Sequence, residues 1–247
     1  MFEIAASGVR EGIYEVYPYK GALRVFTIRA RRETAVIVFL HGGGWVRGTP
    51  LRFEEESLAL AQQGISSLSI EYSIRSRDQT TVYDSLRDVL DAAAFVRDWA
   101  AGQPVIVAGV SAGGLLAFHL ARSPILSPAG VVLISPVLDL SATGFANSAT
   151  PNGGDETISP LHMAFSSFPP VLVFHGSADR IVPSASSVKF VQDLAERGMR
   201  AKIEIAKEVG HNFSKLEPYR KKIARKVASF VLAASNRIAK GQVTLDT

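Results

Sequence analysis

Short runs of apolar and β-branched residues alternate along this chain with longer segments whose apolar residues recur at helical spacing. The apolar runs cover residues 34–40, 66–72, 105–108, 130–135, 171–175 and 201–206. Helical patterns occupy residues 50–63, 82–100, 184–197 and about 220–230. Because parallel strands need long crossover connections, this alternation predicts an α/β fold with a mostly parallel central sheet and helices on both faces.

The length and composition favour one domain. A chain of 247 residues with 47% hydrophobic residues can bury a substantial core, and no linker or internal repeat divides it. We therefore expect a single domain over residues 1–247, opened by two further strands near 13–18 and 22–29. Residues 142–169 lack regular patterning and contain the turn signal Pro151-Asn152-Gly153-Gly154, so we expect a short lid there and no large cap domain.

Composition excludes several classes of protein. The chain has no cysteine, which excludes disulfides, thiolate zinc sites and a thiol nucleophile. No apolar run approaches the length of a membrane span and no secretory signal opens the chain, so we expect a cytoplasmic protein without a membrane partner. The net charge of +4 gathers largely in residues 220–226, at spacing typical of a solvated helix face rather than a nucleic-acid surface. No histidine pair has zinc-site spacing, and we expect neither metal nor cofactor.

The pentapeptide Gly109-Val110-Ser111-Ala112-Gly113 follows one predicted strand and precedes a helical segment. A serine on a sharp strand-to-helix turn needs small residues two positions before and after it, because side chains there would collide with the strand or the helix. Gly109 and Gly113 meet this requirement. A serine with a purely structural role in a tight turn would have the same requirement, so the motif alone does not distinguish the two roles. The turn exposes the hydroxyl of Ser111, our candidate nucleophile, and leaves the N–H of Ala112 unpaired at the helix start.

Other polar motifs also follow predicted strands, where the catalytic groups of open parallel sheets collect. They are His41-Gly42-Gly43-Gly44-Trp45, His175-Gly176-Ser177-Ala178-Asp179 and Gly210-His211-Asn212-Phe213. A serine hydroxyl needs an imidazole to take its proton and a carboxylate to orient that imidazole. Ser111, His211 and Asp179 supply these groups. Asp139, which follows the strand after the serine turn, is the alternative acid.

Serine, then acid, then histidine is the chain order of α/β-hydrolases. With these motifs the chain resembles esterases of that superfamily that have an HGGG-type oxyanion loop, such as hormone-sensitive-lipase-like and bacterial acetyl esterases. The resemblance covers nearly the whole chain and implies the α/β-hydrolase fold. It implies that Ser111 attacks an ester carbonyl, that His211 is general base and then acid, and that Asp179 orients His211.

The resemblance also implies an oxyanion hole. The backbone N–H groups of Gly43, Gly44 and Ala112 would hold the developing oxyanion, and glycines let the loop backbone approach the substrate closely. Trp45 would lie near the acyl pocket or be a buried packing residue. Val110 departs from the lipase-like group, which has aspartate before the nucleophile. That group's longer signature is reduced here to Glu71-Tyr72-Ser73-Ile74.

These features predict a serine carboxylesterase that hydrolyses short-acyl, acetyl-type esters through an acyl-enzyme, with a small-molecule ester as its partner. Because few residues precede His41, we expect an N-terminal cap to be missing and the site to be open. Arylformamidases share the His-Gly-Gly-x-Trp loop but usually have tyrosine at the position of Gly44. A small peptidase or amidase of the same fold is a further alternative: prolyl-oligopeptidase-like peptidases share the order of the three groups and a similar acid motif, but they usually have tyrosine at the position of Ala112. A non-catalytic hydrolase-fold binding protein would be expected to lose part of the triad. Physiological substrate and oligomeric state stay open.

Overall fold

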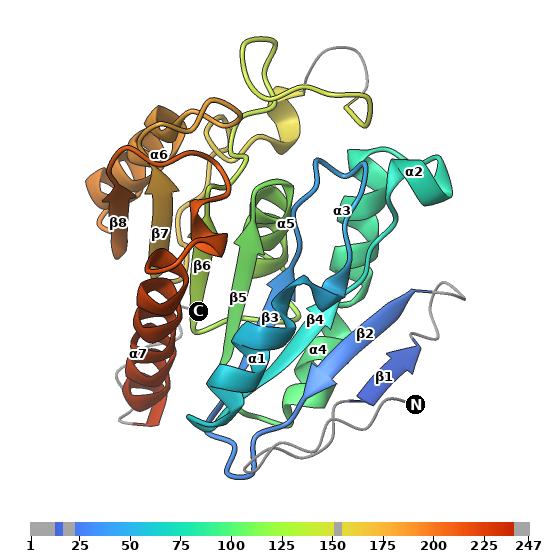
Figure 1. Cartoon of the computed structure of the whole chain (residues 1–247), viewed down its shortest axis with the longest axis vertical. Coiled ribbons are helices and arrows are strands. Elements are labelled where there is room, and N and C mark those ends of the chain that lie inside the picture. Colours follow the sequence, from blue (N-terminus) through green and yellow to red (C-terminus); the bar gives the residue numbers. More distant parts are fainter. Residues whose placement is uncertain (1–12, 17–22, 151–154, 240–247) are drawn as a thin grey trace.

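The computed structural model describes residues 13–16, 23–150 and 155–239, in which strands and helices alternate (Figure 1). The strands are β1 Ile13–Val16, β2 Arg24–Ile28, β3 Ala35–Leu40, β4 Ile65–Ile70, β5 Val105–Val110, β6 Gly130–Ile134, β7 Val171–Gly176 and β8 Ala201–Ala206. The α-helices are α1 Glu54–Ala61, α2 Arg75–Asp78, α3 Val82–Asp91, α4 Ala93–Ala100, α5 Ala112–Ala121, α6 Ser184–Glu196 and α7 Tyr219–Ala239. Single 3-10 turns are η1 Pro50–Phe53, η3 Glu156–Ile158 and η4 Phe213–Lys215.

The strands form one sheet in the order β1-β2-β4-β3-β5-β6-β7-β8. β1 and β2 pair antiparallel with their neighbours, and every pairing from β4 to β8 is parallel. The predicted mostly parallel α/β architecture is thereby confirmed. From β3 the chain moves to β4 on one side and later to β5 on the other, so the strand order reverses at β3. Such a switch point opens a crevice at the carboxyl ends of the two strands.

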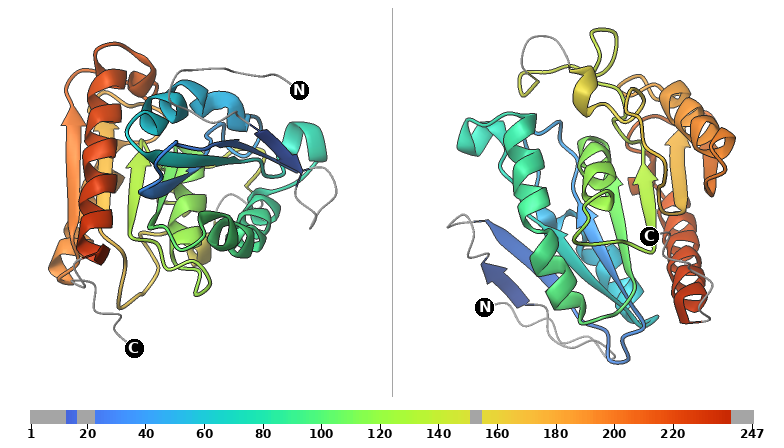
Figure 2. Two further views of the ribbon diagram at one scale, coloured as in Figure 1. Left: turned by 90° about the horizontal axis from the view of Figure 1, so that it is seen from below. Right: turned by 180° about the vertical axis from the view of Figure 1, so that it is seen from behind.

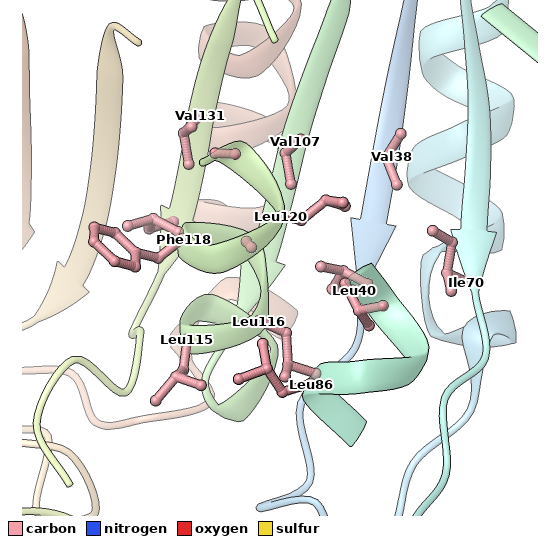
Figure 3. Packing of buried hydrophobic residues seen from close by; sticks show 14 of the residues in the cluster. Val38, Leu40, Ile70, Leu86, Val107, Leu115, Leu116, Phe118, Leu120 and Val131 are labelled. Atoms are coloured by element: carbon pink, nitrogen blue, oxygen red, sulfur yellow. The ribbon is translucent and has the colours of Figure 1, made fainter. Parts of the chain in front are cut away.

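Helices cover both faces of the sheet, as Figure 2 shows edge-on. Alternate residues of β3 divide between two cores, as the two-residue period of a strand requires. Val36, Val38 and Leu40 belong to a buried cluster that includes residues of α3, α4, α5 and α6. Figure 3 shows Val38 and Leu40 of this cluster with Leu86 of α3 and Leu116 of α5. Ile37 and Phe39 belong to a second cluster, which includes residues of α1 and α7. Every residue of β3 is buried, because a central parallel strand is covered on both sides.

Most predicted elements agree with the structure to within two residues, and three points differ. The helix predicted over 82–100 is two helices, because the backbone at Ala92 departs from regular helical geometry and the chain turns there. The short helix α2 has no apolar periodicity and was not predicted. The predicted strands near 13–18 and 22–29 lie partly outside the described residues, and the turn at 151–154 lies wholly outside them.

The basic terminal helix packs one face and exposes the other, as its spacing predicts. Ile223 and Val227 are buried, while Lys222 and Lys226 are exposed and pair with Glu204 of β8. The cationic face is therefore partly neutralised by its own sheet. No helix in the described part of the chain is long and apolar enough to cross a membrane.

Candidate active site

Ser111 lies on a sharp turn between β5 and α5. Its backbone has φ 54° and ψ −120°, a strained conformation for a residue with a side chain. A Cβ on Gly109 would lie 2.2 Å from the carbonyl oxygen of Gly113, and one on Gly113 would lie 2.2 Å from that of Leu40. Both glycines are therefore required by close backbone approach, for the steric reason inferred from the sequence. The peptide groups of Ser111 are held by bonds to the loop after β6, including Val137 N–H to the Ser111 carbonyl at 2.9 Å.

Three side chains that are far apart in sequence form one chain of hydrogen bonds. His211 Nε2 lies 2.9 Å from Ser111 Oγ, and His211 Nδ1 lies 2.6 Å from Asp179 Oδ2. Ser111 follows β5, Asp179 follows β7 and His211 follows β8, so the carboxyl edge of the parallel sheet brings them together. The arrangement can move a proton from the serine hydroxyl to the imidazole.

The Asp179 carboxylate is held as an acceptor on both oxygens. Oδ1 accepts the N–H groups of Ile181 at 2.9 Å and Val182 at 3.0 Å, and Oδ2 faces His211 and His175. Burial opposes ionisation, but the hydrogen bonds from Val182, His211 and Ile181 outweigh it and hold the pKa of Asp179 below its ordinary value. This carboxyl is therefore ionised at neutral pH.

The alternative acid, Asp139, lies elsewhere. Its Oδ1 accepts the Ser141 N–H at 2.8 Å and faces His162 Nε2 at 3.1 Å. It therefore belongs to a polar turn at the start of the irregular segment, and Asp179 is the acid that contacts His211.

A second histidine contacts the same carboxylate. The fully buried His175 places Nε2 3.1 Å from Asp179 Oδ2 and 2.9 Å from the Val182 carbonyl oxygen, while Nδ1 lies 2.8 Å from Ser187 Oγ. Because Nε2 faces two acceptors, it carries the proton, and Ser187 donates to Nδ1. Burial is the main cause that lowers the pKa of His175, so this side chain is neutral and donates to Asp179.

The glycine loop after β3 has the backbone freedom that glycine alone supplies. Gly43 has φ 121° and Gly44 has φ 65°, and a Cβ on Gly43 would lie 1.9 Å from the Arg47 carbonyl oxygen. The Gly43 carbonyl accepts the N–H groups of Val46 and Arg47, and the Gly44 carbonyl accepts the Asn147 amide at 2.8 Å. Within the described chain, no hydrogen bond engages the N–H of Gly43, Gly44 or Ala112. These N–H groups are free to bind an anion.

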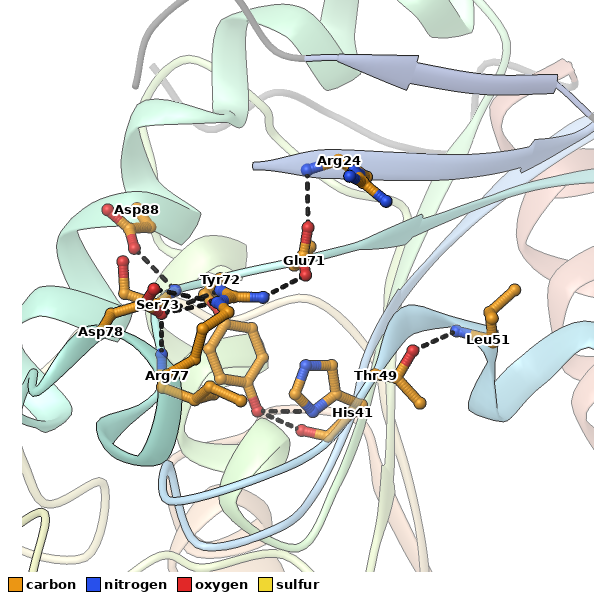
Figure 4. A network of polar contacts seen from close by, with 11 residues as sticks. Arg24, His41, Thr49, Leu51, Glu71, Tyr72, Ser73, Arg77, Asp78 and Asp88 are labelled. Atoms are coloured by element: carbon orange, nitrogen blue, oxygen red, sulfur yellow. Dashed lines mark hydrogen bonds and ion pairs between the residues drawn. The ribbon is translucent and has the colours of Figure 1, made fainter. Parts of the chain in front are cut away.

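His41 supports this loop from beneath (Figure 4). Its ring stacks on Tyr72 with centroids 4.2 Å apart, and the Tyr72 hydroxyl donates to the His41 carbonyl at 2.5 Å. Arg77 donates to the Tyr72 carbonyl at 3.2 Å and thereby ties α2 to the strand end. Burial lowers the pKa of His41 to about 4, so the ring is neutral and acts as a structural support.

A cavity of about 550 Å³ opens over Ser111 and His211. Gly43 and Gly44 form part of its wall, and Phe145 and Ile181 add apolar surface that the sequence did not reveal. Its described lining also includes the cationic residues Arg47, Arg52 and Lys215. No sequence pattern marked these residues, although Arg47 lies three positions after Gly44 of the glycine loop.

Trp45 is not part of this wall. Its side chain is 0% exposed and packs edge-on against Phe145, with ring centroids 5.8 Å apart. Of the two alternatives weighed for Trp45, the structure shows the buried packing residue, so its assignment to substrate binding was wrong. A positive φ of 59° turns the residue after the glycines inward, away from the cavity. Phe145, which packs on Trp45, lines the cavity in its place.

Among the residues that the structure describes, no group of three or more histidine, aspartate or glutamate side chains is arranged to hold a metal ion. The polar groups of the site are instead paired with one another in the hydrogen bonds given above.

Comparisons with known proteins agree with this architecture. Residues 37–156 match a protein family described as alpha/beta hydrolase fold. Versiconal hemiacetal acetate esterase of Aspergillus parasiticus is 31% identical over 122 residues, which are 47% of this chain and 38% of that protein. The chain thus covers 38% of the length of this curated relative.

Solved structures of Thermogutta terrifontis esterase 2 have a similar fold. The form phosphonylated by cyclosarin has a TM-score of 0.80 at 24% identity, covering 90% of this chain and 94% of that one. The propionate-bound form has a TM-score of 0.75 at 23% identity, covering 98% and 97%. The similarity in fold therefore extends over nearly the whole chain.

Proposed function

We propose that this chain, which has the α/β-hydrolase fold, is a serine carboxylesterase that hydrolyses short-acyl, acetyl-type esters through an acyl-enzyme. The observation that carries the proposal is the unbroken chain of hydrogen bonds from Asp179 through His211 to Ser111, at the base of a cavity. A buried serine that only filled a turn would not need this imidazole and carboxylate behind it. The proposed mechanism uses no metal or cofactor.

The proposed acylation step starts at Ser111. Its Oγ attacks the ester carbonyl carbon while His211 Nε2 takes the hydroxyl proton. The carbonyl oxygen becomes an oxyanion held by the N–H groups of Gly43, Gly44 and Ala112. The tetrahedral intermediate collapses as His211 gives its proton to the departing alcohol oxygen, which leaves the acyl group on Ser111.

Water completes the cycle. His211 takes a proton from a water molecule, whose oxygen attacks the acyl carbonyl, and then returns that proton to Ser111 Oγ as the acid leaves. Asp179 keeps the proton of the neutral imidazole on Nδ1, so that the Nε2 lone pair faces the serine. Because its carboxyl stays ionised, it also stabilises the imidazolium formed in each step.

The short-acyl preference is supported by the form of the cavity and by the relatives. We propose that residues 142–169 are a short cover on a single hydrolase domain and that Phe145 limits the room for an acyl chain. The curated relative is named an acetate esterase, and the similar Thermogutta esterase is described with propionate or butyrate bound. These are all short acyl groups.

Loss of the nucleophile tests the proposal directly. We expect the purified protein to hydrolyse p-nitrophenyl acetate faster than long-chain p-nitrophenyl esters, and Ser111→Ala to lose about a thousandfold or more of kcat/KM. Ser214→Ala is the matched control, since Ser214 also lines the cavity but contacts neither His211 nor Asp179 in the described hydrogen bonds. Unchanged hydrolysis by Ser111→Ala would remove Ser111 from the mechanism.

A substrate panel separates this function from its alternatives. Acetyl esters, N-formylkynurenine and peptide amides would all be attacked by Ser111, but they differ in their acyl and leaving groups. The proposal requires the acetyl esters to have the highest kcat/KM. Preference for the formamide or the amides would assign the chain to the arylformamidase or peptidase alternatives.

A further inference from the structure

We propose that the cavity binds esters that carry a negatively charged group, and that Arg47 and Lys215 hold this group at its mouth. The proposal deepens the esterase function given above and rests on it for turnover, but it also makes a claim about binding alone. Nothing in the relatives' names or in the family description assigns these two residues a role.

Arg47 belongs to the glycine loop itself. Its N–H donates to the Gly43 carbonyl at 3.2 Å, which fixes the loop as a tight turn. Its Cγ lies 3.4 Å from the position that a Cβ on Gly43 would occupy, so the stem of the side chain runs along this glycine. The side chain of Arg47 is exposed and lines the cavity together with Gly43 and Gly44.

Lys215 approaches from the histidine loop. It ends η4, four residues after His211, and its N–H donates to the Asn212 carbonyl at 3.0 Å. Its side chain is exposed and lines the same cavity. The two cations therefore stand on the loop that carries Gly43 and Gly44 and on the segment that follows His211, and both line the cavity that contains Ser111.

The charge of this cavity is uncompensated. Arg52 also lines it but pairs with Glu56 at 3.0 Å, whereas no ion pair among the described residues engages Arg47 or Lys215. Lys215 also borders a neighbouring hollow that is lined by four glutamates. Glu55 and Glu217 pair with Arg220, and Glu56 pairs with Arg52, whereas Glu54 has no ion pair among the described residues and is the acidic group in this hollow that competes for Lys215. None of the described residues that line the catalytic cavity is Asp or Glu.

A cleft lined by one sign of charge concentrates ligands of the opposite sign. Carboxylate and phosphate groups suit this mouth because a guanidinium and an ammonium both donate hydrogen bonds to their oxygens. Apolar Phe145 and Ile181 line the same cavity and suit the uncharged part of such a substrate. The anionic group of such an ester would thus bind Arg47 and Lys215, and its apolar part would contact Phe145 and Ile181.

The test compares matched charged and neutral esters. Mono-4-nitrophenyl glutarate and 4-nitrophenyl pentanoate differ by a carboxylate on the acyl side, and 4-acetoxybenzoate and its methyl ester differ by one on the alcohol side. For at least one pair we expect the ratio of kcat/KM, charged over neutral, to fall about four- to twenty-fivefold in Arg47→Gln/Lys215→Gln, because each exposed ion pair contributes about two- to fivefold. In the wild type, 1 M salt should reduce this ratio similarly, because it shortens the screening length to about 3 Å.

Further variants make the result decisive. Arg31→Gln/Lys202→Gln removes the same two charges near the amino edge of the sheet, far from the site, and should leave the ratio unchanged. Calorimetric binding of the four esters to Ser111→Ala, with and without Arg47→Gln/Lys215→Gln, measures charge preference without turnover. Equal ratios in the wild type and the cavity variant, in both hydrolysis and binding, overturn the anionic site. A charge preference in binding that depends on Arg47 and Lys215, without any hydrolysis by the wild type, overturns only the esterase function.

Discussion

At the scale of single residues, the two carboxylate oxygens of Asp179 are shared by four hydrogen-bond donors. Asp179 Oδ2 faces both His211 and His175, and Oδ1 accepts two backbone N–H groups. A carboxylate so held cannot rotate without breaking several bonds at once. His211 therefore keeps the ring orientation that directs Nε2 to Ser111.

His175 is accordingly expected to act as a positioning residue. His175→Leu removes the donor to Asp179 and leaves the Val182 carbonyl and the Ser187 hydroxyl unpaired, which costs about 1–3 kcal/mol of stability for each buried group. We expect kcat on p-nitrophenyl acetate to fall about tenfold or more. The acid limb of the kcat/KM profile should also move to higher pH, because the carboxylate is then more available to the imidazolium.

His175→Gln supplies the control, since its amide can still donate to Asp179. It should recover most of kcat and the position of the acid limb. If the leucine and glutamine variants were equally impaired in both measurements, His175 would be a packing residue only.

At the scale of elements, the irregular segment before β7 is hydrogen-bonded to the glycine loop that we propose as part of the oxyanion hole. Asn147 donates from Nδ2 to the Gly44 carbonyl at 2.8 Å and accepts the Ala149 N–H on Oδ1 at 2.8 Å. The Ala149 carbonyl in turn accepts the Val82 N–H at the start of α3. The segment therefore couples the loop to a core helix.

Asn147→Asp isolates the contact with the oxyanion loop. Aspartate can still accept the Ala149 N–H, but it cannot donate to the Gly44 carbonyl, which is left without this partner. We expect kcat to fall about tenfold with little change in KM, because the oxyanion groups act mainly in the transition state. Thermal unfolding checks that the fold of the variant is intact. If kcat stayed at the wild-type value, the contact between Asn147 and Gly44 would not contribute to catalysis.

At the scale of the whole molecule, the parallel sheet places the loops that carry Ser111, Asp179 and His211 at one edge, and buried side chains pack against the ends of the strands there. His41 is one of these buried side chains. Burial lowers its pKa from 6.5 to about 4, so between these pH values the unfolded chain binds a proton at His41 that the folded protein does not. The free energy of unfolding should therefore fall as the pH decreases through this window, by about 3 kcal/mol for this one group.

Urea unfolding at a series of pH values between 7 and 4 measures this effect. Burial also lowers the pKa values of His175 and His119, which add to the fall in the same direction. His41→Gln should be less stable than the wild type at pH 7 but should lose less stability on acidification. Equal losses in the two proteins would show that His41 is protonated in the folded state.

The sequence by itself determined the α/β architecture, the order of the central strands and helices along the chain, and the strained turn at Ser111. These depend on local causes: the period of apolar residues, and the space that Gly109 and Gly113 leave for the backbone. The same local patterns could not show the break at Ala92 or the short helix α2, whose four residues carry no periodicity.

Only the tertiary structure decided which side chains meet. It placed Asp179 rather than Asp139 beside His211, turned Trp45 into the core and brought Phe145 to the cavity. It also set Arg47 and Lys215 on facing loops. The reason is distance: residues that follow different strands come together only when the parallel sheet aligns the ends of those strands, and no pattern within one segment encodes that alignment.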